Sequence, residues 1–283
     1  QLKMLCDKIM AEKKLKDGNV FLKKNLKQRT RYEGLIGISP KMQETYEIIE
    51  RIGRRSPSVL IQGEKGTGKE LVARAIHKRS DRANGPFVPV NCSAIAEGSL
   101  ESEFFNHVTD LFDAARGGTI FLDEVAEIPP SFQAKLLQAF HQQDEPREGA
   151  NGELKTDVRI IAATEKDPDQ FAKNGTFRED LFYRFDLFSL KLPPLRERRE
   201  DICLLVNHFL AIYYNTAGEN ALAVSPEVMD IFLEHHWPGN VRQLENIIKR
   251  AVGAGADKII EIAHLPREMR KFAMGNGGGP CAK

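Results

Sequence analysis

The sequence predicts an α/β fold in which helices cover both faces of a parallel sheet, followed by a smaller helical unit. Between residues 35 and 195, short apolar runs alternate with segments of helical periodicity, a pattern typical of parallel sheets covered by helices. Pro193 and Pro194 then interrupt the pattern, and residues 196–270 carry helical periodicity throughout. At 283 residues the chain is long enough for one large core and a smaller second one, or for two domains.

Five apolar runs are predicted to form the sheet, at residues 59–62, 87–91, 119–123, 158–163 and 186–192. We expect an amino-terminal helix and linker at residues 1–32, an α/β subdomain at 33–195, a helical subdomain at 196–272 and a flexible tail at 273–283. Leu2, Leu5 and Ile9 form a narrow apolar stripe, which fits a solvated helix or, as the alternative, a short coiled coil.

The composition argues against several classes of partner. The chain has 41 basic and 40 acidic residues, and a net charge of +1 creates no strong field toward nucleic acid or membrane. Its four cysteines are scattered without metal-ligand spacing, which is typical of a reducing cytoplasm. Because the sequence has no apolar run of membrane-spanning length and no signal-peptide pattern, we expect a cytoplasmic protein with no membrane partner. Since the first residue is Gln1, we expect a piece of a longer protein.

A glycine-rich stretch follows the first predicted strand and opens a predicted helix. This order, with a lysine in the first turn of the helix, is the phosphate-binding loop arrangement. Backbone amides, the helix N-terminus and the lysine all attract phosphate there, whereas the alternative is a glycine-rich turn that binds nothing. The position after the lysine usually holds a Ser or Thr that contacts Mg²⁺, but here it is glutamate. The predicted nucleotide-binding residues of this stretch are Gly63, Glu64, Lys65, Gly66, Thr67, Gly68, Lys69, Glu70 and Leu71.

A second stretch, G-G-T-I-F-L-D-E, ends a buried strand in the two carboxylates Asp123 and Glu124. In open α/β folds, ligands bind at this carboxyl edge of the sheet. Asp123 is predicted to hold Mg²⁺, directly or through water, and Glu124 to orient and deprotonate an attacking water. Two acids that are simply solvated are the alternative. Taken with the phosphate loop, the pair favours a functional site over two solvated acids. Together with the family resemblance given below, it predicts an ATPase with ATP and Mg²⁺ as cofactors.

Seven motifs in order make the resemblance specific: G-E-K-G-T-G-K-E, V-N-C-S-A-I, E-S-E-F-F-N-H, G-G-T-I-F-L-D-E-V, F-R-E-D-L-F-Y-R-F, L-P-P-L-R-E-R and W-P-G-N-V-R-Q-L-E-N. Over residues 34–270 the chain resembles the central AAA+ domain of bacterial enhancer-binding proteins, the sigma-54-dependent transcription activators of the NtrC type. That family also carries glutamate after the lysine, as at Glu70.

The resemblance implies an AAA+ P-loop fold, a three-layer αβα arrangement with a parallel five-stranded sheet and a small all-helical lid. It also implies a ring-forming ATPase, a homo-oligomer of six or seven subunits. The implied partners are the RNA polymerase–sigma-54 holoenzyme, which the ring remodels to activate transcription, and DNA, which a C-terminal domain outside this chain would bind. A less favoured hypothesis is that the chain belongs to another kind of AAA+ remodeller, such as a helicase loader or chaperone.

By position, the resemblance assigns further site residues. Asn91 matches the residue that restrains the catalytic glutamate, although an asparagine at a strand end can also cap a turn. Arg178 and Arg184 match arginines that enter the neighbouring subunit's nucleotide site, where a guanidinium stabilises charge on the γ-phosphate; exposed surface arginines are the alternative.

The lid region of the family contributes one more arginine. Arg242 matches the lid arginine that senses nucleotide within its own subunit. Ile36 and Gly37 resemble the segment that packs against adenine, although core packing explains Ile36 equally well. Residues 226–252 could be read as a DNA-binding helix-turn-helix, but the balanced charges of the second helix indicate a packed lid element instead.

The chain departs from the family in two places. The insertion that carries G-A-F-T-G-A and contacts sigma-54 is missing between His107 and Gly117. The family's Thr-Asn after the fourth strand is Thr164-Glu165, so Thr164 could contact the γ-phosphate or the attacking water, whereas Glu165 adds negative charge near the phosphate. These departures leave a second hypothesis open, a nucleotide-responsive scaffold that binds ATP, hydrolyses almost none and does not engage sigma-54.

Overall fold

The structure, a computed structural model, describes residues 31–54, 58–94, 110–144, 158–166, 177–185, 188–214, 222–255 and 258–270. Residues 1–30 of the N-terminal helix and linker expected at 1–32, and the tail expected at 273–283, lie outside the described residues. So does most of the segment where the G-A-F-T-G-A insertion would join, because residues 95–109 are not described. In the part of the chain that is described, no helix is long and apolar enough to cross a membrane.

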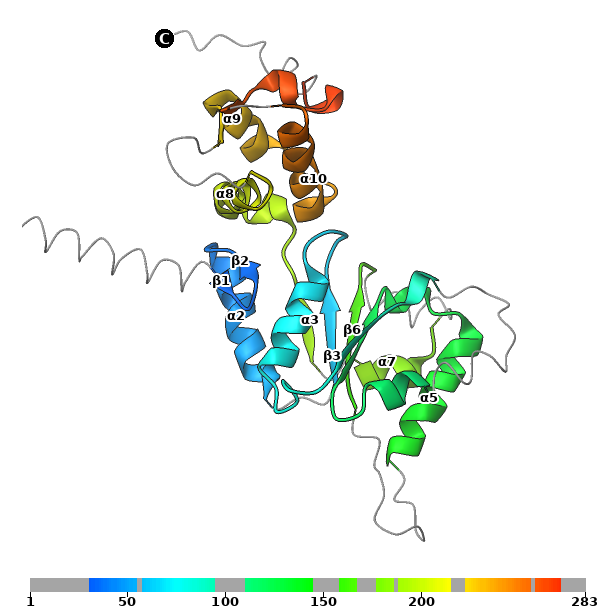
Figure 1. The fold of residues 1–283 in the computed structure, drawn as a ribbon. Coiled ribbons are helices and arrows are strands. Elements are labelled where there is room, and N and C mark those ends of the chain that lie inside the picture. The colour runs from blue at the N-terminus through cyan, green and yellow to red at the C-terminus, as the bar shows by residue number, and fades with distance from the viewer. Residues whose placement is uncertain are drawn as a thin grey trace, which may run out of the picture.

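The centre of the molecule is a parallel sheet of five strands in the order β4-β5-β6-β3-β7 (Figure 1). Each predicted apolar run supplies one strand, although the last run contributes only three residues. The strands are β3 (Ser58–Gln62), β4 (Phe87–Asn91), β5 (Thr119–Asp123), β6 (Arg159–Thr164) and β7 (Ser189–Lys191). The α/β fold with a parallel sheet is therefore confirmed.

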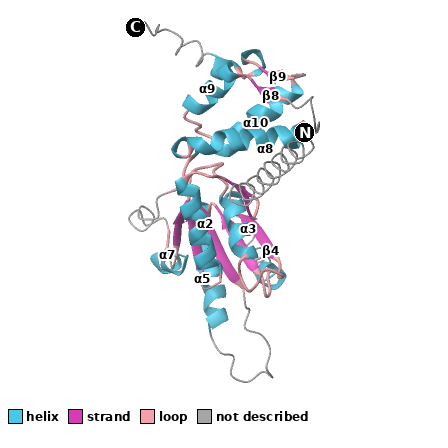
Figure 2. Ribbon diagram, turned by 90° about the vertical axis from the view of Figure 1, so that its left-hand side faces the viewer, coloured by secondary structure: helices cyan, strands magenta, loops and turns pink. Residues whose placement is uncertain are grey.

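Helices cover both faces of the sheet (Figures 1 and 2). Alternate residues of each strand point to opposite faces, so Leu60 packs in one apolar cluster and Ile61 in another. The Ile61 cluster contains the apolar faces of α2 (Pro40–Gly53) and α3 (Lys69–Lys78). The Leu60 cluster contains those of α5 (Pro130–Asp144) and α7 (Glu179–Phe185). The result is the three-layer arrangement that the sequence predicts.

The lid has a separate apolar core. The lid contains α8 (Ile202–Tyr213), α9 (Pro226–Glu234) and α10 (Asn240–Gly253), with a short parallel pairing of β8 (Ala223–Val224) and β9 (Ile259–Ile260). A small antiparallel pair, β1 (Arg31–Tyr32) and β2 (Leu35–Ile36), precedes α2.

The lid stands over the end of the sheet where the loop after β3 turns into α3 (Figure 1). Trp237 fixes the turn between α9 and α10, because its ring is fully buried and its Nε1 donates a 2.7 Å hydrogen bond to Phe232 O. A short segment of 3-10 turns, Leu195–Glu197 and Arg199–Asp201, connects the sheet to α8. In this segment Asp201 Oδ1 accepts hydrogen bonds from Ile38 N and Ser39 N, at the start of α2. The connecting segment is thereby bonded to the α/β subdomain as well as to the lid.

Candidate nucleotide-binding site

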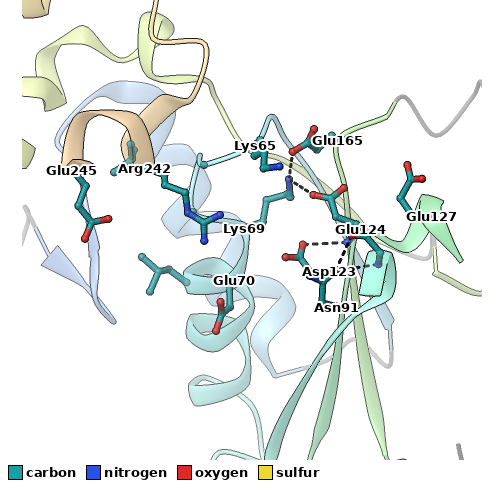
Figure 3. A pocket seen from close by; sticks show the side chains of 15 residues that line it. Lys65, Lys69, Glu70, Asn91, Asp123, Glu124, Glu127, Glu165, Arg242 and Glu245 are labelled. Carbon is teal, nitrogen blue, oxygen red and sulfur yellow. Dashed lines mark hydrogen bonds and ion pairs between the residues drawn. The ribbon is translucent and has the colours of Figure 1, made fainter. Parts of the chain in front are cut away.

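A cavity of about 600 Å³ opens where the loop before α3, the carboxyl ends of the strands and the lid meet (Figure 3). This volume lies within the range of pockets that bind small molecules. Its walls come from three places in the sequence: the loop and first turn of α3, the ends of β4, β5 and β6, and the start of α10. The lining residues are Lys65, Gly66, Gly68, Lys69, Glu70, Leu71, Asn91, Ser93, Asp123, Glu124, Glu127, Glu165, Val241, Arg242 and Glu245.

Glycine conformations and internal hydrogen bonds shape the loop before α3. Gly68 has a φ of +106°, a region open to glycine, and it places the backbone so that α3 starts at Lys69. Lys69 is only 7% exposed, and its Nζ donates a 2.9 Å hydrogen bond to Gly63 O. Thr67 Oγ1 donates to Glu64 O at 2.7 Å, which closes the loop on itself. A lysine charge and a helix N-terminus therefore face the cavity together.

The two carboxylates predicted from the strand motif lie across the cavity from the loop (Figure 3). Glu124 Oε1 lies 3.4 Å from Lys69 Nζ, and Asp123 Oδ1 accepts a hydrogen bond from Glu124 N at 3.2 Å. Glu124 has a φ of +55°, a left-handed conformation that is uncommon for a non-glycine residue. Such conformations cluster at functional sites, where the surrounding structure holds them.

Burial makes both carboxylates more basic than a solvated acid. Burial raises the pKa of Glu124; Lys69 opposes that shift, while Glu165 and Asp123 add to it. The pKa of Asp123 is also raised by burial and is again opposed by Lys69. A carboxylate with a raised pKa is a better proton acceptor near neutral pH, which is the property a general base requires.

Glu165 adds a third carboxylate to the cavity that Asp123 and Glu124 line. It follows β6, lines the same cavity, and its Oε1 lies 3.6 Å from Lys69 Nζ (Figure 3). The sequence predicts extra negative charge near the phosphate at this position, and the structure directs that charge at the loop lysine. Lys69 is thus shared between two carboxylates, those of Glu124 and Glu165.

Two residues predicted to touch the reacting groups have other contacts here. Asn91 lines the cavity, and its Oδ1 accepts hydrogen bonds from Ser93 N and Ser93 Oγ at 3.1 and 2.8 Å, which is the turn-capping role. Its restraint of Glu124 stays a prediction. Thr164 is fully buried rather than lining the cavity, and its Oγ1 accepts from Lys166 N at 3.1 Å. The predicted contact between Thr164 and the γ-phosphate also stays untested.

The arginines predicted to act between subunits belong to the α7 region, Arg178 directly before the helix and Arg184 within it. Arg178 has a side chain that is 51% exposed and binds Asp180 through both Nε and Nη2, at 3.0 and 2.7 Å. Its backbone N donates to Gln133 Oε1, which fixes the start of α7 against α5. Arg184 lies in the same helix, and its side chain is outside the described part of the structure. The structure therefore does not bring Arg178 to its own subunit's loop.

The remaining predicted residues divide between the cavity and the core. Arg242, from the first turn of α10, lines the cavity opposite the carboxylates, close to Glu70 (Figure 3). Ile36 is half-buried and packs against the lid core, whereas Gly37 is buried and its carbonyl accepts from Gln43 Nε2 at 3.1 Å. Ile36 therefore packs against the lid core and is not among the residues that line the cavity, and the contact of Ile36 and Gly37 with adenine stays a prediction.

The donor groups fit a Mg²⁺–nucleotide pair. Among the described residues, no group of three or more His, Cys, Asp or Glu side chains could hold a metal ion by itself. Mg²⁺ at nucleotide sites typically takes one or two carboxylates, with phosphate oxygens and water completing its coordination. Asp123 supplies such a carboxylate facing the loop, so the residues present suit a metal that arrives with its phosphates.

A family profile described as the sigma-54 interaction domain matches residues 35–191. A second profile, described as the AAA+ ATPase lid domain, matches residues 196–276. The chain belongs to the sigma-54 interaction domain family. The second match also settles the nature of residues 226–252: they are part of an AAA+ lid, not a DNA-binding helix-turn-helix.

Relatives of this chain are named as nitrogen fixation and regulatory proteins. The chain is 41% identical over 268 residues to nitrogen fixation protein AnfA of Azotobacter vinelandii, covering 91% of this chain and 50% of AnfA. It is 45% identical over 244 residues to regulatory protein AtoC of Escherichia coli (strain K12), covering 82% of this chain and 53% of AtoC. The chain therefore spans about half the length of these two relatives.

A crystal structure of NtrX from Brucella abortus in complex with ATP has the same architecture. It superimposes with a TM-score of 0.72 and 37% identity, covering 94% of this chain and 64% of NtrX. A second NtrX structure, in complex with ADP, gives a TM-score of 0.73 with 37% identity, covering 92% of this chain and 62% of NtrX.

Three residues at the loop were missed by sequence reasoning. Arg196 binds Glu64, Asn240 binds the carbonyl of Lys65, and Arg198 binds that of Thr67. These residues lie in the L-P-P-L-R-E-R and W-P-G-N motifs, which served only to recognise the family. The polar and charged side chains that follow the prolines of these motifs were the available signal.

Proposed function

We propose that this chain binds ATP with Mg²⁺ and hydrolyses it as the AAA+ motor of a sigma-54-dependent transcription regulator. One observation carries the proposal: Lys69, Asp123 and Glu124 meet in a single cavity at the N-terminus of α3. The crystallisation of the related NtrX with ATP and with ADP supports the choice of nucleotide. The family match supports the regulatory setting.

In the proposed reaction, a water oxygen forms a bond to the γ-phosphorus while the bond from that phosphorus to the β–γ bridging oxygen breaks. The bridging oxygen leaves with ADP, and the water proton passes to Glu124 before it is released to solvent or phosphate. The raised pKa of Glu124 favours this transfer. Lys69 and the α3 N-terminus offset negative charge on the phosphates. Asp123 would hold Mg²⁺, which when bound supplies positive charge against the phosphate oxygens.

Arg178 and Arg184 are proposed to complete the site of a neighbouring subunit in a ring of six or seven. Support comes from the position of α7, which presents the Arg178 side chain to solvent instead of to its own cavity. A guanidinium remains charged at any physiological pH and can stabilise charge on the transferred phosphoryl group. Activity is then a property of the assembled ring.

The proposed output is remodelling of the RNA polymerase–sigma-54 holoenzyme, with DNA bound by a domain outside this chain. The family match supports this output, whereas the absence of a G-A-F-T-G-A sequence between His107 and Gly117 argues for a scaffold that does not engage sigma-54. An in vitro transcription assay separates them: ATP-dependent open-complex formation with sigma-54 holoenzyme supports remodelling, and hydrolysis without open complexes supports the alternative.

A nucleotide-responsive scaffold is also favoured by the ion pair between Glu165 and Lys69. That carboxylate opposes the arrival of the γ-phosphate at the lysine. Calorimetry of ATP binding together with steady-state phosphate release decides between the two functions. An ATPase binds ATP·Mg²⁺ and releases phosphate continuously, a scaffold binds it and releases almost none, and failure to bind either ATP or ADP refutes both.

A further inference from the structure

The phosphate loop is held from outside by the lid and the segment leading to it. Four consecutive residues of the loop, 64 to 67, each accept at least one hydrogen bond from this outer layer. The donors lie in the connecting segment at Arg196 and Arg198 and at the start of α10, residues 240–242. We refer to these five donor residues as the loop clasp.

Arg196 and Asn240 hold the first half of the loop. Arg196 Nη1 and Nη2 donate to the two carboxylate oxygens of Glu64, at 2.8 and 2.6 Å, a two-point geometry that fixes orientation. Asn240 Nδ2 donates to Glu64 Oε2 at 3.1 Å and to Lys65 O at 3.0 Å. Asn240 Oδ1 in turn accepts from Leu195 N at 2.7 Å, which joins the lid to the connecting segment.

The second half of the loop is held by backbone and by a buried arginine. Gly66 O accepts from Val241 N and Arg242 N, at 2.9 and 3.3 Å. Gly66 cannot be replaced here, because its φ is +76° and an added Cβ would lie 2.4 Å from Gly239 O. Arg198 is buried, and its Nη2 donates to Thr67 O at 2.9 Å.

Asn240 is built into this contact at a conformational cost. It is fully buried and has a φ of +49°, and Trp237 in the same turn has a φ of +51°. Asparagine tolerates the left-handed conformation better than most residues, and strained positions persist where the surrounding structure determines them. The turn is held by Asn240 N, which donates to Trp237 O at 2.8 Å. The lid therefore presents the Asn240 amide to the loop from a rigid base.

We propose that Asn240, Arg196 and Arg198 are positioning residues that hold the phosphate loop in its nucleotide-binding conformation, so that nucleotide affinity depends on the lid contact. The inference rests on the proposed nucleotide function. A loop that is held in place before binding loses less freedom on binding, and affinity falls with the fraction of molecules in the competent conformation. By reciprocity, nucleotide in the loop stabilises the lid against the sheet.

The test uses the 283-residue chain and the variant Asn240→Asp. Aspartate keeps the acceptor for Leu195 N but loses both donors to the loop. We expect ADP and ATP affinities, measured by calorimetry, to fall by about tenfold each, the change expected when such hydrogen bonds are lost. Amide hydrogen exchange over residues 64–68, measured without nucleotide, should accelerate by a similar factor.

The double variant Asn240→Asp with Glu64→Gln provides the rescue. The amide introduced at position 64 can donate to the new carboxylate, so the double variant should regain part of the lost ADP affinity. If Asn240→Asp acted only by lowering overall stability, the second substitution would not restore that affinity. The matched control is Glu197→Gln. It removes an ion pair of the connecting segment that does not involve the loop, Lys41 Nζ to Glu197 Oε2 at 2.6 Å. ADP affinity should therefore stay within about twofold of that of the unaltered chain.

Unchanged ADP affinity and unchanged loop exchange in Asn240→Asp would overturn the inference. If that variant does not fold, Arg196→Lys decides by the same two measurements, because it alters a partly exposed side chain and keeps its charge. Failure of the unaltered chain to bind ADP would instead refute the proposed function. In that case loop exchange still tests the clasp.

Discussion

Lys69 of the phosphate loop and Glu165 after β6 form an ion pair, with Nζ and Oε1 3.6 Å apart. The family pattern has an amide at the glutamate position, so this chain places a charge where a neutral group is expected. A γ-phosphate that reaches Lys69 meets the carboxylates of both Glu165 and Glu124. Glu165 is therefore expected to weaken the binding of ATP more than that of ADP, which has no γ-phosphate.

Glu165→Asn should tighten ATP binding about fivefold, because a partly exposed charge of this kind contributes ~1 kcal/mol. ADP affinity should change by less than about twofold in the same variant. Calorimetry with each nucleotide measures both values. Asp113→Asn is the matched charge control, since Asp113 pairs with Arg116 on the surface away from the cavity. Equal gains for ATP and ADP would show that Glu165 does not act on the γ-phosphate.

Arg178→Ala should abolish phosphate release and leave ATP binding intact. The reason is that its side chain lies outside its own cavity and is proposed to act in the neighbouring subunit. Specific activity of the unaltered chain should rise with protein concentration as rings form.

Mixing two inactive variants gives the sharper version of this test. Lys69→Ala subunits keep Arg178, and Arg178→Ala subunits keep an intact loop, so mixed rings should regain part of the activity. A constant specific activity down to dilute monomer, or no recovery on mixing, would contradict action between subunits.

Arg159 should contribute to stability without contributing to catalysis. It is buried at the start of β6, and its Nη1 and Nη2 donate to Gly53 O and Ile52 O at 2.7 and 2.9 Å, in the last turn of α2. Burial lowers the pKa of Arg159 to about 10, and the group still carries its charge at neutral pH.

Arg159→Met should lower the free energy of unfolding by ~2 kcal/mol, since two buried carbonyls lose their donors. Urea denaturation measures the change. Arg116→Ala serves as the control for an exposed arginine, and its free energy of unfolding should lie within about 0.5 kcal/mol of that of the unaltered chain. A loss in Arg159→Met no larger than that of the control would show that the link between α2 and β6 is energetically unimportant.

His77 should make stability depend on pH. Burial lowers its pKa, and its Nδ1 lies 2.9 Å from Thr119 Oγ1. As pH falls below about 6.5, the unfolded chain takes up a proton that the folded chain refuses, so the free energy of unfolding decreases down to the folded pKa. His77→Asn removes this contribution.

The difference in the free energy of unfolding between the unaltered chain and His77→Asn should therefore shrink as the pH falls from about 7.5 to about 5.5, as measured by urea denaturation. Other titrating groups are common to both proteins and cancel in the difference. A constant difference would mean that His77 titrates alike in the folded and unfolded chains, and a difference that widens toward low pH would mean that folding raises its pKa.

Sequence reasoning could predict the elements that depend on local pattern. The apolar run in 119–123 gives a buried strand, and a lysine after a glycine-rich turn gives a phosphate loop, because both signals lie within a few residues. The last strand was shorter than its apolar run because β7 pairs with β3 only over three positions, from Leu60↔Ser189 to Gln62↔Lys191.

The loop clasp could not be predicted in this way. Glu64 and Asn240 are 176 positions apart in the sequence, and their contact depends on how the lid docks on the sheet. The contact of Thr164 could not be predicted either, although it is local. Its hydroxyl accepts a hydrogen bond from Lys166 N, and this bond competes with the predicted contact to phosphate. Glu165 was predicted to add charge near the phosphate, but its pairing with Lys69 required the three-dimensional position of β6 beside β3.

Phosphate release by the variant Glu124→Gln, at ATP concentrations that saturate both proteins, tests the central claim most directly. The exchange keeps the shape of the side chain and removes its ability to accept a proton. If Glu124 is the general base, the variant should bind ATP·Mg²⁺ with similar affinity and release phosphate roughly 10² to 10⁴ times more slowly. An unchanged rate of phosphate release with ATP bound would contradict the account.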